Sequence, residues 1–145
     1  DRLTALREAA RVARRGAPVV AAAISRFAAA IDGLDSGYCD DPEYVAILER
    51  QLEQGSHFNP TGNPQYFTTA YFHLPEELAA EMAEAGFDDV DVIAVESIGW
   101  VAADLDERMV DDARQAALLE LLERLERAPS LLGASPHLLG VGRAP

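Results

Sequence analysis

The stretch that decides the fold is residues 2–24, RLTALREAARVARRGAPVVAAAI, in which a helical pattern runs through a glycine turn into an apolar segment. Leucines and alanines in its first half recur every three to four positions, which is the spacing of one helix face. Gly16 is suited to end this helix, and Pro18 prevents it from continuing. The apolar run Val19–Ile24 is typical of a buried parallel strand, although its alanines would equally suit a helix.

Helices alternate with apolar strands along the rest of the chain. Asp41 and Pro42 form an N-cap and a first-turn proline, and Pro75 opens a helix whose early acids suit its positive end. Alternating valines and aspartates after Gly86 indicate a strand. This order predicts an α/β fold with a layered sheet. The expected helices cover residues 3–14, 25–37, 42–55, 75–86 and 111–127, and the expected strands cover residues 19–24, 90–95 and 137–141.

Charge and composition exclude several classes of function. The chain has 145 residues, the length of a single domain, with 25 acidic residues against 12 basic ones and a net charge of −13. This acidity argues against a nucleic-acid binder. No apolar run approaches the ~18 residues that a membrane helix needs, so we expect a cytoplasmic protein without a membrane partner. The single Cys39 excludes an internal disulfide, and the spacing of His57, His73 and His137 predicts no metal site.

Half of the aromatic side chains of the chain lie between Phe58 and Phe72, and two histidines flank this segment. Apolar walls with a few polar tips are typical of small-molecule sites, so we favour a pocket over simple packing of these rings onto the sheet. Arg26 follows the predicted strand 19–24 at its carboxyl end, where it would pair with an acidic ligand group or with a carboxylate of residues 27–73. The alternative is that Arg26 is solvated or forms a purely structural ion pair. No catalytic residue is assigned. The candidate substrate-binding residues are Arg26, Phe27, Tyr66, Phe67, Tyr71, His73 and Trp100.

Three segments resemble the second half of a class I S-adenosylmethionine-dependent methyltransferase, in the order of that family. Residues 2–28, RLTALREAARVARRGAPVVAAAISRFA, resemble its fourth helix and fifth strand. Residues 74–97, LPEELAAEMAEAGFDDVDVIAVES, resemble the following helix and the sixth strand. Residues 135–145, SPHLLGVGRAP, resemble the seventh, antiparallel strand, and residues 27–73 resemble the variable substrate cap of bacterial members. The resemblance implies part of a Rossmann-like methyltransferase sheet, strands five to seven, with a helical and aromatic cap insertion.

The same resemblance implies an enzyme that transfers a methyl group from S-adenosylmethionine to a small-molecule acceptor. Members of the family hold this cofactor in their first half, with a glycine-rich turn after the first strand and an acidic residue after the second. Gly140 and Gly142 have the G-x-G spacing, but no helix follows them. We therefore expect residues 1–145 to be the C-terminal portion of such a domain. This portion would supply the acceptor side, hold no cofactor-binding residue and be inactive in isolation.

Two further expectations concern partners and an alternative function. In such a sheet the segment Val19–Ile24 would pair with a fourth strand that has no counterpart here, so we expect an exposed apolar strand edge. That edge would associate with a second copy of the chain or with the missing N-terminal half. The alternative function is a non-enzymatic α/β module for binding or interaction.

Overall fold

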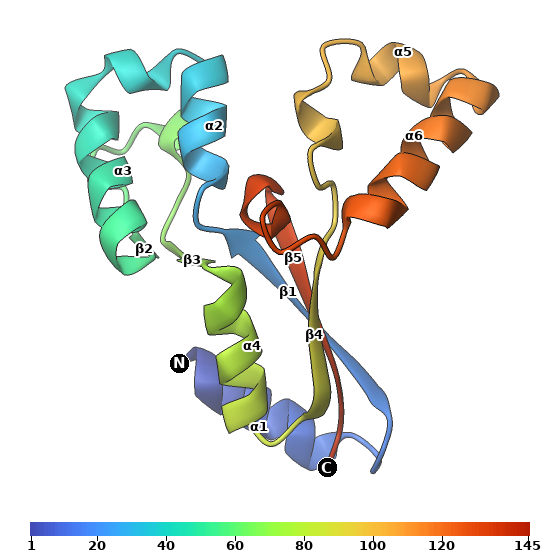
Figure 1. The fold of residues 1–145 in the computed structure, drawn as a ribbon. Coiled ribbons are helices and arrows are strands. Elements are labelled where there is room, and N and C mark those ends of the chain that lie inside the picture. The colour runs from blue at the N-terminus through green and yellow to red at the C-terminus, as the bar shows by residue number, and fades with distance from the viewer.

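The computed structural model describes residues 1–145 and confirms an α/β fold (Figure 1). Its five strands form one mixed, open sheet in the order β2-β3-β1-β5-β4. The three strands expected from the sequence are present, and the structure adds two short ones, which lie at the two ends of the aromatic segment. The strands are β1 (Pro18–Ser25), β2 (Ser56–His57), β3 (Ala70–His73), β4 (Asp88–Ala94) and β5 (His137–Arg143).

Strand β1 has different neighbours from those expected. It pairs antiparallel with β5 along its whole length, and its parallel neighbour β3 pairs with it only at Ile24 and Ser25. The expectation of a buried parallel strand is therefore wrong for most of β1, and Val20 has 58% of its surface exposed. The edge from Pro18 to Ala23 that faces away from β5 pairs with no strand. The unpaired edge that the resemblance implied for Val19–Ile24 is therefore present except at Ile24, which pairs with β3.

Six helices accompany the sheet, and all five predicted helices are among them. Helix α3 begins where the Asp41 side chain accepts a hydrogen bond from the backbone N–H of Glu43, and it ends at Gly55, whose φ is 74°. The helices are α1 (Arg2–Val12), α2 (Ala28–Asp35), α3 (Pro42–Gln54), α4 (Pro75–Glu84), α5 (Leu105–Met109) and α6 (Asp112–Leu125).

Strand β5 lies between β1 and β4, is antiparallel to both, and packs beneath α4. Leu138 is fully buried there, as is Met82 of the helix. A Cβ atom added to Gly140 would collide with the sulfur of Met82, and one added to Gly142 would lie 3.1 Å from the Cβ atom of Phe87. The two glycines therefore allow α4 to approach the sheet closely.

The spacing of Val45, Leu48 and Leu52 predicts one apolar stripe for helix α3, but the helix buries a different face. Leu48 and Leu52 belong to the expected stripe, but Leu52 is exposed, and Tyr44 and Ile47 are buried instead. These two residues pack on Tyr66 of the aromatic segment. The prediction failed because the partner of α3 is this aromatic segment, which lies elsewhere in the sequence.

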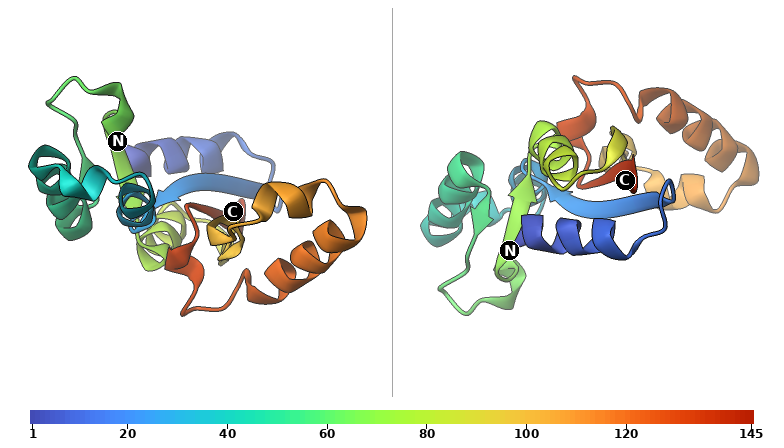
Figure 2. Two further views of the ribbon diagram at one scale, coloured as in Figure 1. Left: turned by 90° about the horizontal axis from the view of Figure 1, so that it is seen from above. Right: turned by 90° about the horizontal axis from the view of Figure 1, so that it is seen from below.

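Helix α1 is attached to α4 by ion pairs. Arg2 Nη2 lies 2.7 Å from Glu81 Oε1, and Arg7 Nη2 lies 3.1 Å from Glu84 Oε1. Figure 2 shows α1 running alongside β1. None of the helices combines the length and the apolar character needed to cross a membrane.

Candidate small-molecule site

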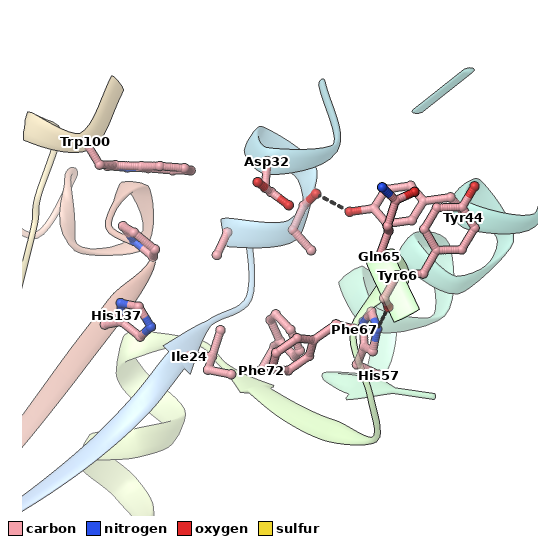
Figure 3. Close-up of a pocket in the computed structure, with 13 residues that line it drawn as sticks. Ile24, Asp32, Tyr44, His57, Gln65, Tyr66, Phe67, Phe72, Trp100 and His137 are labelled. Atoms are coloured by element: carbon pink, nitrogen blue, oxygen red, sulfur yellow. Dashed lines mark hydrogen bonds between the residues drawn. The ribbon is translucent and has the colours of Figure 1, made fainter. Parts of the chain in front are cut away.

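A cavity of about 250 Å³ lies at the carboxyl end of β1, between the aromatic segment, α2, Trp100 and the start of β5 (Figure 3). Because β5 is antiparallel to its neighbours, its first residue, His137, lies at the same edge as the last residues of β1 and β4. Ligands of open α/β sheets bind outside the carboxyl ends of the strands. The aromatic lining residues are Tyr44, Tyr66, Phe67, Phe72 and Trp100, and the polar ones are Asp32, His57, Gln65 and His137.

One side of the cavity is an aromatic wall. The ring centroid of Phe72 lies 5.1 Å from that of His57 and 6.2 Å from that of Phe67, in tilted and edge-on arrangements that stabilise such pairs. Phe67 has a φ of 64°, a left-handed conformation that is uncommon outside glycine. Backbone strain of this kind concentrates at ligand sites. The side chain of Phe67 is also half exposed, so its apolar ring lies at the mouth of the cavity.

The two tyrosine hydroxyls beside this wall are already engaged. Tyr44 donates to the backbone oxygen of Ala29 over 2.7 Å, and burial raises the pKa of Tyr44 to about 12. Tyr66 donates to Asp41 Oδ2 over 2.6 Å, which raises the pKa of Tyr66 and lowers the pKa of Asp41. Both hydroxyls therefore keep their protons, and neither is a candidate base.

His57 is held within the wall by both of its ring nitrogens. Nδ1 lies 2.7 Å from Gln51 Oε1, and Nε2 lies 2.8 Å from the backbone oxygen of Tyr66. Gln51 in turn donates from Nε2 to the backbone oxygen of Arg26 over 2.8 Å. Because the imidazole is buried and both nitrogens face oxygen atoms, His57 joins α3 to the aromatic segment and has no nitrogen left for a ligand.

The opposite side of the cavity carries Trp100 and a pair formed by His137 and Glu96. Trp100 is fixed by a 2.8 Å hydrogen bond from Nε1 to the backbone oxygen of Ala134. His137 Nδ1 lies 2.6 Å from Glu96 Oε1, and the backbone N–H of His137 donates to Glu96 Oε2 over 3.1 Å. The buried hydroxyl of Ser135 lies 2.9 Å from the same Oε2 and 2.9 Å from the backbone oxygen of His137, and its one hydrogen can be donated to either acceptor. Burial acts to raise the pKa of Glu96, but these hydrogen bonds lower it overall.

The turn after β4 holds Glu96 in place. Ser97 has a φ of 47°, a left-handed conformation that costs free energy in a serine. The backbone N–H groups of Glu96 and Ser97 both donate to Ser135 Oγ over 3.1 Å. These hydrogen bonds attach the strained turn to Ser135, two residues before β5, and they fix the Glu96 carboxylate beside His137.

The structure places the sequence-predicted site residues in three different locations. Tyr66, Phe67 and Trp100 line the cavity. Phe27 lies outside it, against Gly133 in a shallower hollow near the start of α4. The other three, Arg26, Tyr71 and His73, belong to a separate polar cluster between β3, α4 and α1.

Arg26 is used internally. It is buried, and its Nη2 lies 2.5 Å from Glu77 Oε2 and 3.2 Å from the hydroxyl of Tyr71. Its Nε also donates to the backbone oxygen of Phe72 over 3.1 Å. Glu77 lies outside residues 27–73, so the structure contains the structural ion pair and not the expected pairing with a carboxylate of that segment. The guanidinium thereby fixes β3 against α4.

His73 and Tyr71 complete this cluster. His73 Nε2 lies 3.3 Å from Glu81 Oε2, and burial lowers the pKa of His73. The guanidinium of Arg2 lies 3.4 Å from the ring centroid of Tyr71 and also bonds Glu81. Burial acts to raise the pKa of Glu81, but its hydrogen bonds from Arg2 and His73 lower it overall. These contacts join α1 to α4 and lie apart from the residues that line the cavity.

Sequence reasoning did not select Glu96, Asp32 or His137 as site residues. Glu96 and His137 are 41 positions apart, so no short motif joins them. Glu96 nevertheless follows the predicted strand 90–95, and His137 begins the predicted strand 137–141, so their positions could have indicated a shared site. An antiparallel pairing of those two strands places both residues at one edge of the sheet.

In comparisons with known proteins, no protein-family model matches the chain, and no curated protein sequence matches it significantly.

Proposed function

We propose that the chain forms the acceptor-binding part of an S-adenosylmethionine-dependent methyltransferase that acts on a small molecule. The resemblance implies an antiparallel last strand, and β5 is antiparallel to both β1 and β4, which resemble the fifth and sixth strands. The proposal also takes residues 27–73 as the substrate cap. These residues provide the α2 side and the aromatic wall of the cavity.

The observation that carries the proposal is the position of the cavity. It opens at the carboxyl end of β1, where α/β sheets bind their ligands. Its walls are mostly apolar with a few polar groups, as in sites for small organic molecules. Rings fixed by mutual contacts orient a bound molecule, and methyl transfer depends largely on alignment of the reacting groups.

The residues of this chain do not fit the cofactor itself. Gly140 and Gly142 are the only G-x-G pair, and both lie within β5 beneath α4. The space beside them is filled by Met82 and Phe87, so no ligand can approach their backbone. Residues 1–145 are therefore proposed to make no contact with the cofactor. Their proposed role is to bind and orient the acceptor.

The protein expressed from its entire gene provides the test. It is incubated with S-adenosylmethionine that carries a ¹³C-labelled methyl group and with a panel of small acceptors, and the products are analysed by mass spectrometry. We expect label in at least one acceptor. Phe67→Ala should lower kcat/KM by about tenfold or more, because a displaced substrate loses rate on this scale. Glu120→Gln, an exposed carboxylate paired with Arg124 on α6, is the matched control and should have no effect.

The absence of labelled product with every acceptor would contradict the proposal. If the cavity then still bound a small molecule saturably, the alternative of a non-enzymatic binding module would stand in its place.

A further inference from the structure

His137 brings a hydrogen-bond acceptor to a cavity whose walls are mostly apolar. Its Nδ1 is bonded to Glu96, whereas its Nε2 makes no hydrogen bond within the chain. A carboxylate only accepts hydrogen bonds, so Nδ1 carries the hydrogen, and in the neutral form of the ring Nε2 carries a lone pair. Figure 3 shows His137 at the cavity beside Ile24, on the same side as Trp100. The pair therefore presents an oriented acceptor to a bound molecule.

The tautomer of His137 is fixed by the surroundings of Glu96. The backbone N–H of His137 donates to Oε2, and the Ser135 hydroxyl lies beside the same oxygen, which leaves Oε1 for the imidazole. Rotation of the carboxylate cannot change this, because both of its oxygens only accept. Such a carboxylate behind a histidine sets which ring nitrogen is free.

The size and lining of the cavity define the rest of the ligand. An apolar cavity of about 150 Å³ holds one benzene molecule. The present cavity of about 250 Å³ therefore has room for one substituted aromatic ring. Phe67, Phe72 and Trp100 offer ring surfaces for stacked or edge-on contact.

We infer that the cavity binds a single-ring aromatic molecule with a hydroxyl group, whose O–H donates to Nε2 of His137, and that Glu96 is the positioning residue. The inference rests on the proposed function only in that it takes the cavity as the acceptor site. It requires neither S-adenosylmethionine nor methyl transfer.

Asp32 offers a competing chemistry, because its carboxylate also lines the cavity. If Asp32 dominated recognition, the preferred ligand would be a protonated amine. The test therefore compares three probes of similar shape: 4-methylphenol, its methyl ether 4-methylanisole, and 4-methylbenzylamine.

Binding of each probe to the 145-residue chain is measured by titration with detection by NMR. We expect 4-methylphenol to bind about three- to tenfold more tightly than 4-methylanisole, the range that one hydrogen bond supplies. His137→Phe keeps a ring but removes the acceptor, so it should abolish this preference while retaining binding of the ether. Equal affinity for phenol and ether, or tighter binding of the amine, would overturn the inference.

The role of Glu96 has a spectroscopic test that a merely structural residue would not satisfy. In Glu96→Gln the backbone N–H of His137 requires the amide oxygen at the Oε2 position, so the amide NH₂ faces His137 Nδ1. The neutral imidazole should then change to the Nε2–H tautomer, which ¹⁵N chemical shifts distinguish, and the phenol preference should disappear. Glu120→Gln should change neither. An unchanged tautomer in folded Glu96→Gln would refute the positioning role.

The outcomes separate this inference from the proposed function. Phenol preference without methyl transfer by the whole gene product supports the ligand class and contradicts the methyltransferase proposal. Methyl transfer to acceptors without a hydroxyl group, with no phenol preference, supports the enzyme and contradicts the inference.

Discussion

Gly140→Ala tests how β5 packs beneath α4. The new Cβ atom would collide with the Met82 sulfur and lie 3.2 Å from Leu78 Cγ. Met82 is fully buried and Leu78 nearly so, so neither side chain can move into solvent. Overpacking of this kind costs about 1–3 kcal/mol of unfolding free energy. Urea denaturation followed by circular dichroism should show a lower midpoint with an unchanged slope.

The matched control is the double-mutant cycle with Met82→Ala. Truncation of Met82 alone should lower the unfolding free energy by about 2–5 kcal/mol. It also removes the sulfur atom with which the new Cβ atom of Gly140→Ala would collide. We therefore expect the double variant to lose less stability than the two single losses combined, with a coupling of about 0.5–3 kcal/mol. A Gly140→Ala protein within about 0.5 kcal/mol of the wild type would refute the claim that the glycine exists for packing.

Three further predictions concern the polar cluster, the sheet edge and pH. Glu77→Gln should lower the unfolding free energy by about 2–3 kcal/mol in urea titrations, somewhat less than for a fully buried pair, because Arg26 loses its charged partner. The unpaired edge of β1 should cause concentration-dependent self-association in sedimentation experiments, which Val20→Lys should suppress; a wild-type monomer at high concentration would contradict this. The pKa of Glu96 in the folded protein is lower than its ordinary value of 4.5, so ionised Glu96 stabilises the fold at pH values above 4.5. This stabilisation is lost as the pH falls through the lowered pKa. Urea titrations between about pH 5 and about pH 3 should therefore show a steeper loss of stability in the wild type than in Glu96→Gln, and equal slopes would count against that contribution.

The helix ends could be predicted from sequence because their signals act over a few residues. Asp41 caps α3 through a backbone N–H two positions away, and Gly55 ends it through its own φ. Strand partners are set by contacts between distant segments. The short strands β2 and β3 and the pairing of β3 with β1 were therefore missed, although the apolar run of β1 was found and the resemblance implied an antiparallel last strand.

The candidate site divides in the same way. The aromatic density of the sequence identified Tyr66 and Phe67 as pocket residues, and both line the cavity. The roles of Arg26 and Glu96 depend on carboxylates and hydroxyls that are far away in the chain. Arg26 meets Glu77 across 51 positions, and Glu96 meets Ser135 across 39, so composition and spacing indicate neither contact.

The fluorescence of Trp100 gives the most direct test that the cavity is the acceptor site. Trp100 is the single tryptophan of the chain and lines the cavity, so its emission reports occupancy without a label. Titration of the 145-residue chain with a molecule that the methyl-transfer assay identifies as an acceptor should change this emission saturably, and Phe67→Ala should weaken the apparent affinity by about tenfold, or ~1.4 kcal/mol. A methylated acceptor that leaves the Trp100 emission unchanged, and that binds the wild type and Phe67→Ala equally well, would contradict the account.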